Sequence, residues 1–162
     1  MALRQIRQYG DDILTKKAKP VREFGASLHL LLEDMWDTLR EQEGLGLAAP
    51  QVGALRQVFI VELGEDTYEL INPKLVEFSG TNERVEACLS IPGKQGTVER
   101  PAFVKMEAVD RNGDAFEVET DDELLVTVLC HELDHLHGVL YLEKATNIED
   151  RVLLDEDEEE EH

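Results

Sequence analysis

The stretch "TDDELLVTVLCHELDHLHG", residues 120–138, contains the strongest structural pattern in this chain. Thr120 and Glu123 have the spacing of a helix capping box, and Gly138 is typical of the position that follows a helix. We therefore predict one helix over residues 121–137. At about 100° per residue, its apolar side chains occupy two faces. Such a helix is central: one face packs on a sheet, and the face that carries the histidines lines a cavity.

Two histidines of this predicted helix indicate a metal site. His131 and His135 lie four residues apart, so both imidazoles project from one side and can bind one divalent ion. Glu132 is then within reach of a water molecule on that ion. The alternative is a pair of ordinary helix histidines, one of them hydrogen-bonded in the core. We favour the metal because desolvating two imidazoles and a carboxylate is costly without a compensating cation.

A catalytic ion of this kind needs a third protein ligand, because an open site commonly has three ligands and a water. Tyr141 stands where the metzincin proteases have their third histidine, and His137 faces another side of the helix. The strongest candidate is Cys88, in "VEACLSIPG" at 85–93, because a thiolate suits zinc, iron(II) or nickel. The alternative for Cys88 is a small core residue, which is how we interpret Cys130.

The rest of the chain predicts an α+β fold. Apolar residues at helical spacing over 26–43 indicate an amphipathic helix near the N-terminus, capped at Gly44. Residues 57–63 and 67–79 have the composition of strands, the second with a break at its proline, and "NG" at 112–113 joins two alternating segments in a hairpin. We therefore expect antiparallel strands packed around a central metal-binding helix, with an N-terminal amphipathic helix.

Length and composition fit a single catalytic domain. The chain has 162 residues, 42% of them hydrophobic, and a formal net charge of −20, to which the run "DEDEEEE" at 155–161 contributes. We predict a catalytic domain over 1–147 and a disordered acidic C-terminal tail over 148–162. The acidic balance argues against nucleic acid as a direct partner. Without an apolar run long enough for a membrane span or a secretory signal, we expect an intracellular protein with no membrane association.

Three separated stretches, "GLGLAAPQVG" at 44–53, "EACLS" at 86–90 and "HELDH" at 131–135, resemble the motifs of the peptide deformylase family in order and separation. This family removes the formyl group from the initiator methionine of nascent bacterial or organellar proteins. The resemblance covers residues 3–145 and implies one divalent metal ion per chain. Fe2+ is the expected ion, and Zn2+, Ni2+ or Co2+ are possible substitutes.

The resemblance also implies roles for individual residues. The ion is bound by Cys88, His131 and His135. Glu132 is the general acid/base, while Gln51 and the backbone N–H of Leu89 hold the oxygen of the reacting carbonyl. In this scheme metal-bound hydroxide attacks the formyl carbonyl, and a proton passes through Glu132 to the departing amine.

The implied substrates are N-formylmethionyl peptides of nascent chains. In the first motif, Leu45 and Gly46 are expected to contact the peptide, because the glycines there have no Cβ and let an extended backbone approach closely. Leu124 and Val128, which lie one and two turns before His131 on its face, are expected to line an apolar pocket for the methionine side chain. Core packing is the alternative for both.

Residues around the motifs add both support and departures. Asp134 and Arg100 resemble a family ion pair that braces the metal helix, and Glu86 is either a hydrogen-bond partner near the ligands or an exposed carboxylate. Ala87 stands where the family usually has glycine, which is harmless only if its φ is negative. Gln95 replaces an arginine that contacts the peptide in many members.

The resemblance also bears on location and alternatives. A bacterial-type cytoplasm is the expected location, with an organelle as the other option. Ribosome association through the acidic C-terminal end is not expected, because ribosomal RNA repels such a segment. Two other functions stay open from sequence: a metzincin-like metalloprotease, and a deformylase-like binding protein without activity.

Overall fold

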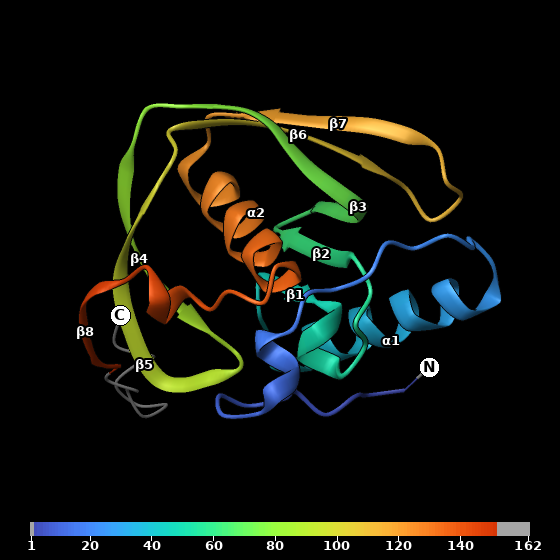
Figure 1. Ribbon diagram of the computed structural model, residues 1–162, viewed down its shortest axis with the longest axis horizontal. Coiled ribbons are helices and arrows are strands. Elements are labelled where there is room, and N and C mark those ends of the chain that lie inside the picture. The colour runs from blue at the N-terminus through green and yellow to red at the C-terminus, as the bar shows by residue number, and fades with distance from the viewer. Residues whose placement is uncertain (1, 152–162) are drawn as a thin grey trace.

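The computed structural model describes residues 2–151 and has the expected α+β architecture (Figure 1). Its helices and 3-10 turns are η1 (Asp12–Thr15), α1 (Ala26–Gln42), η2 (Ala49–Val52), α2 (Glu123–Leu136) and η3 (Tyr141–Glu143). Its strands are β1 (Gly46–Ala48), β2 (Val58–Leu63), β3 (Asp66–Ser79), β4 (Asn82–Cys88), β5 (Ile91–Arg100), β6 (Phe103–Val109), β7 (Ala115–Thr120) and β8 (Thr146–Asp150). They form two antiparallel sheets, of order β1-β2-β3-β6-β7 and β4-β5-β8.

The helix α2 is central, and the strands surround it in Figure 1. Its apolar side chains join those of β2, β3 and β6 in one buried cluster, which includes Phe59, Leu70, Met106, Leu129 and Leu133. The predicted arrangement of antiparallel strands around a central helix is therefore confirmed. Within the described residues, no helix combines the length and apolarity needed to cross a membrane.

The predicted capping box of α2 is wrong in detail. The helix begins at Glu123, and its N-cap is Asp122, whose carboxylate accepts a hydrogen bond from the Leu125 N–H at 3.0 Å. The Thr120 hydroxyl oxygen instead accepts from the N–H of Asp122, also at 3.0 Å. A carboxylate at the N-cap also interacts favourably with the helix dipole, which accounts for the later start.

The first helix, α1, spans Ala26–Gln42 and buries Leu28, Leu32 and Leu39 against β1 and β2. Glu43, not Gly44, adopts the left-handed cap conformation, with a φ of 53°. Gly44 serves a different purpose, because a Cβ there would lie 3.0 Å from the side chains of Leu39 and Leu89.

The other strand predictions hold with one refinement. The strand β3 continues through Pro73, and the expected break is a register shift between Ile71 and Lys74, with Asn72 at a φ of 52°. The hairpin predicted at the "NG" of 112–113 is formed by β6 and β7.

The boundary expected after residue 147 falls inside β8. This strand pairs with β5, placing Asp150 opposite Lys94 and Glu149 opposite Gln95. The side chains pair as well, Lys94 with Asp150 and Gln95 with Glu149. Cross-strand pairs of opposite charge favour this register, so the domain extends at least to Asp150. The acidic run at 155–161, which we expect to be disordered, lies outside the described residues.

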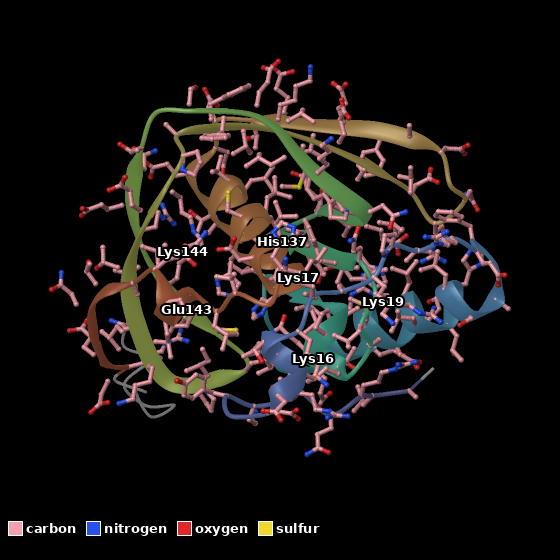
Figure 2. The ribbon with its side chains drawn as sticks, viewed as in Figure 1. Lys16, Lys17, Lys19, His137, Glu143 and Lys144 are labelled. Atoms are coloured by element: carbon pink, nitrogen blue, oxygen red, sulfur yellow. The ribbon has the colours of Figure 1, made fainter. Side chains whose placement is uncertain are left out.

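A lysine-rich segment crosses the C-terminal end of α2, where Figure 2 labels Lys17 close to His137. Lys16, Lys17 and Lys19 belong to a segment that crosses this end, where the Ala18 N–H donates to the Leu136 carbonyl at 2.9 Å. Positive charge near a helix C-terminus interacts favourably with the helix dipole. Lys17, which adjoins Ala18, is placed to make this interaction.

The crossing is tight at Gly138. Its φ is 75°, and a Cβ there would lie 2.5 Å from the carbonyl oxygen of Thr15. We predict that Gly138→Ala lowers the free energy of unfolding by about 3 kcal/mol, because it adds a backbone clash to an unfavourable φ. Gly64→Ala, with a φ of 62° and open space around the added Cβ, isolates the conformational cost. Urea denaturation measures both, and equal losses in the two variants would contradict the predicted clash.

Candidate metal centre

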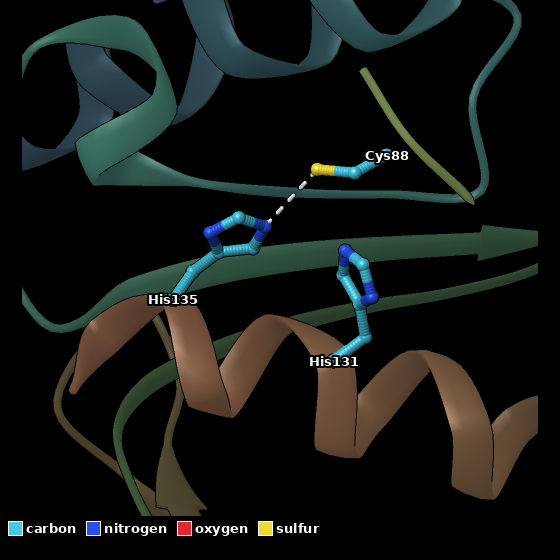
Figure 3. A group of neighbouring side chains, drawn as sticks. All are labelled: Cys88, His131 and His135. Carbon is cyan, nitrogen blue, oxygen red and sulfur yellow. Dashed lines mark hydrogen bonds between the residues drawn. The ribbon is translucent and has the colours of Figure 1, made fainter. Parts of the chain in front are cut away.

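The structure brings together the three predicted metal ligands from separate elements (Figure 3). His131 and His135 project from α2, and Cys88 lies at the end of β4. One ligand atom from each lies within 4.8 Å of the others, and the Cys88 sulfur is 3.3 Å from His135 Nε2. A thiolate and two imidazoles at this separation fit one divalent ion of the zinc, iron or nickel type.

The surroundings of the two imidazoles shift their pKa values in opposite directions. Burial lowers the pKa of His135 well below its usual value, and repulsion from His131 lowers it further. Burial also opposes the charged form of His131, but its neighbours Cys88 and Glu86 raise its pKa well above the usual value. The surroundings therefore favour the neutral form of His135, which is the form that coordinates a metal ion, whereas they favour protonation of His131 in the metal-free protein.

An unpaired polar atom supports the fit of an ion at this centre. Among the described side chains, the buried Oε1 of Glu132 has no hydrogen-bond partner, and the nitrogen of His135 that faces Cys88 is Nε2, 3.3 Å from the sulfur. A buried polar atom without a partner is unfavourable, and such atoms gather where a ligand or water belongs. Both atoms belong to the motif that the sequence identifies as metal-binding.

Glu132 is the carboxylate best placed for proton transfer. It is 4% exposed, and its burial raises its pKa from 4.5 to about 7. A Cβ on Gly46 would lie 2.8 Å from Glu132 Oε2 and equally close to Val128. The absence of a side chain at Gly46 therefore makes room for the carboxylate beside β1.

A buried charge network orients the ligands from behind. His131 Nδ1 is hydrogen-bonded to Glu86 at 2.8 Å, and Arg100 donates twice to the same carboxylate, at 2.6 and 2.7 Å. Arg100 also donates to Asp134 at 2.7 Å, which confirms the ion pair expected between these two residues. Glu86 is 4% exposed, so its interpretation as an exposed carboxylate is wrong. Ligating histidines are commonly held by a carboxylate in this way.

Gln51 lies beside the ligands, as expected. Its side-chain nitrogen donates to the Ser90 hydroxyl at 3.1 Å and lies 3.5 Å from the Cys88 sulfur. Its amide oxygen accepts from the Ala48 N–H at 2.9 Å. Leu89 directly follows Cys88, so its N–H is adjacent to the ligand. Ser90 ends the "EACLS" motif, and nothing in the sequence around it predicts this contact with Gln51.

The residues expected to contact a peptide differ in exposure. Leu45 is 45% exposed and Leu124 is 38% exposed, whereas Val128 is only 7% exposed. The Val128 side chain lies against the backbone of Gly46. Leu124 is therefore the more exposed of the two helix residues, and Val128 lies deeper, beside Gly46 together with Glu132.

The two departures from the family motifs are structurally mild. Ala87 is not among the described residues with positive φ, so its methyl group causes no backbone strain. Gln95 donates to Glu149 at 2.8 Å on the neighbouring strand β8. Tyr141, at the metzincin histidine position, presents an aromatic ring 5.9 Å from the His131 ring centre rather than a third imidazole.

Together, the fold and the donor set define an α+β protein of the single-ion metallohydrolase class. The family model for polypeptide deformylase matches residues 3–151. A peptide deformylase of Thermoanaerobacter pseudethanolicus is 47% identical over 160 residues, which cover 99% of this chain and 97% of that protein. The chain therefore belongs to the peptide deformylase family.

Solved structures agree with this assignment. A crystal structure of a peptide deformylase from Legionella pneumophila matches with a TM-score of 0.86 and 37% identity, covering 90% of this chain and 87% of that chain. The peptide deformylase of Thermotoga maritima matches with a TM-score of 0.86 and 35% identity, covering 89% and 98%. At these identities the likeness extends beyond the fold alone.

The raised pKa of Glu132 predicts a pH-dependent stability. Between 4.5 and about 7 the native metal-free protein holds a proton that the unfolded chain has lost, so stability falls as pH rises through this window. Glu132→Gln removes the cost of the buried charge, which is on the order of 3 kcal/mol above the window. We expect the variant to gain stability over the wild type at about pH 8 and little at about pH 5, measured by urea denaturation with metal chelated. An equal gain at both pH values would contradict this assignment.

The buried network predicts a loss of metal affinity on mutation of Glu86. Glu86→Gln keeps the shape but weakens the hydrogen bond to His131 and leaves Arg100 with less compensating charge. We expect Zn2+ to bind about 10- to 100-fold more weakly, measured by competition with a chelator. Glu83→Gln, on an exposed position of the same strand, is the matched control. Equal affinities in the two variants would exclude the proposed support of His131.

Proposed function

We propose that this chain removes the N-formyl group from the initiator formyl-methionine of nascent polypeptides, using one divalent metal ion. The proposal is carried by one observation: Cys88, His131 and His135 converge beside the buried Glu132 in a member of the peptide deformylase family. The substrates in this proposal are N-formylmethionyl peptides.

Cys88, His131 and His135 would hold the ion. When bound there, the ion would supply Lewis-acid chemistry, polarising a carbonyl and lowering the pKa of water. We propose Fe2+ as the working ion and Zn2+, Ni2+ or Co2+ as substitutes, because a soft thiolate with two imidazoles suits all four. The family resemblance favours iron among them.

Glu132 would carry the proton. A carboxyl group with a pKa of about 7 is well matched to take a proton from the attacking water and to release it afterwards. Its acceptor would be the amine nitrogen of methionine, which leaves when the C–N bond of the formamide breaks. The oxygen of the water would end in formate.

The carbonyl oxygen gains negative charge during this reaction, and two donors would stabilise it. The Gln51 side-chain nitrogen and the Leu89 backbone N–H flank Cys88 from two different segments. Preorganised donors of this kind are worth more in a water-poor site, where they need no reorganisation during the reaction.

The peptide would bind along β1. This strand is at the end of the sheet order, and Gly46 leaves its backbone open next to Glu132. Leu45 and Gly46 would contact an extended peptide, and Val128 with Leu124 would enclose the methionine side chain. Apolar contacts of this size favour methionine over polar first residues.

The place of action follows from the substrate. We propose a bacterial-type cytoplasm, where nascent chains emerge, which is supported by the bacterial origin of the relatives. Ribosome contact, if it occurs, would use residues other than the acidic run at 155–161.

The test is formate release from formyl-Met-Ala-Ser by protein purified without oxygen, analysed for metal, and loaded with iron(II) or nickel. We expect turnover by the wild type and a loss of about 10²- to 10⁴-fold in kcat for Glu132→Gln with metal content unchanged. Glu123→Gln, on the exposed first turn of the same helix, should leave kcat unaltered. Absence of formate with metal bound would overturn the proposed function.

A further inference from the structure

The side-chain amide of Gln51 is held in one orientation. The Ala48 backbone N–H can only donate, so the atom that it faces at 2.9 Å must be the amide oxygen. The amide nitrogen therefore points the other way, toward Cys88 and Ser90. The side chain presents a donor, not an acceptor, to the metal centre.

Ser90 fixes one of the two hydrogens on that nitrogen. Its hydroxyl oxygen accepts from Gln51 Nε2 at 3.1 Å, and Ser90 is fully buried at 0% exposure. With one N–H directed at Ser90, the planar geometry of the amide directs the second N–H toward the Cys88 sulfur, 3.5 Å away. The direction of the second N–H thus depends on the first.

The N-terminal segment anchors both residues through their backbones. The Arg7 N–H donates to the Gln51 carbonyl at 2.7 Å, and the Tyr9 N–H donates to the Ser90 carbonyl at 2.7 Å. Gln51 lies in η2 and Ser90 lies between β4 and β5, far apart in sequence. Two donors that are two residues apart therefore hold both backbones, which leaves the side-chain contact little freedom.

We propose that Ser90 is a positioning residue: by holding one N–H of Gln51, it directs the second N–H, which faces Cys88 Sγ in this structure, toward the side of the metal centre where the carbonyl oxygen becomes negatively charged in the reaction. This assignment rests on the proposed function, since it deepens the role of Gln51 there. Ser90 acts only through Gln51 and touches no reacting atom.

Removing the hydroxyl has a specific consequence. In Ser90→Ala the amide oxygen keeps its bond to Ala48, but the nitrogen loses one of its two partners, so the plane of the amide is held less tightly and the direction of the second N–H varies more. A misaimed donor stabilises the transition state less, although ground-state peptide binding is unaffected. The kcat should fall about 10-fold, less than for complete removal of a donor, and KM should change by less than about 2-fold.

The kinetic test is a double-mutant cycle with metal-loaded wild type, Ser90→Ala, Gln51→Ala and the double variant. We expect Ser90→Ala to lower kcat about 10-fold in the wild type and less than about 2-fold when Gln51 is already alanine. An equal loss in both backgrounds would show that Ser90 acts independently of Gln51 and would overturn the proposal.

A second readout is independent of turnover. In the zinc-loaded protein, the two N–H signals of the Gln51 side chain can be assigned by their loss in Gln51→Ala. Ser90→Ala should accelerate their exchange with solvent by about 10-fold or more, because their fixed partner is gone. Unchanged exchange would overturn the proposal. If the wild type releases no formate, the proposed function fails, and this measurement alone decides the role of Ser90.

Thr38→Val is the matched control for loss of a buried hydroxyl. Thr38 is 2% exposed and donates within α1 to the Asp34 carbonyl at 2.8 Å, away from the metal centre. We expect it to lower the melting temperature as Ser90→Ala does, while kcat and the Gln51 signals stay as in the wild type. A matching loss of kcat in Thr38→Val would attribute both effects to general destabilisation and overturn the proposal.

Discussion

The metal centre depends on a buried ionic connection between β5, β4 and α2. Arg100 of β5 donates to Glu86 of β4 and to Asp134 of α2, and Glu86 in turn holds His131. Separating any of these charges from its partner inside the protein is strongly unfavourable, so the three elements have one arrangement in which all are satisfied. This arrangement sets Cys88, two residues after Glu86, against the histidine face of the helix. The ligand distance is therefore a consequence of the charge network behind it.

The same burial that fixes the ligands also adjusts their chemistry. His135 is neutral because its surroundings disfavour a cation, and Glu132 holds its proton to about pH 7 because its surroundings disfavour an anion. Glu132 Oε1 has no hydrogen-bond partner among the described residues, so the metal-free fold leaves this carboxyl group only partly satisfied. The burial of polar groups at the metal centre lowers the stability of the fold, and the apolar cluster on the other faces of α2 offsets this loss. Because α2 is apolar on two sides, it can carry the polar metal centre on one face and still pack in the core through the others.

Sequence patterns predicted the parts of this structure that depend on local chemistry. Helical periodicity and the histidine spacing placed α2, and the β-branched runs placed β2, β3 and the β6–β7 hairpin. Sequence patterns did not predict the features that depend on contacts between residues far apart in the chain. All residues of β8 are exposed and acidic or polar apart from Ile148, so only its pairing with β5 makes it a strand. The sequence around Glu86 fits an exposed carboxylate equally well, because its partner Arg100 lies fourteen residues further along the chain. Ser90 gave no signal by itself, because its partner Gln51 is 39 residues away.

The close approach at Gly46 links substrate binding to proton transfer. The backbone of β1, where we propose that the peptide lies, is separated from Glu132 and Val128 by less than the space of one methyl group. Any side chain at this position must displace the carboxylate or the valine, so the strand that receives the peptide and the residue that moves the proton cannot vary independently. Since Val128 and Glu132 also lie one turn apart on α2, the wall of the proposed methionine pocket and the proton carrier are parts of one rigid element. Binding energy from the methionine side chain would then help to align the formyl group with Glu132. Binding energy used in this way lowers the activation barrier, whereas binding energy without alignment only tightens substrate binding.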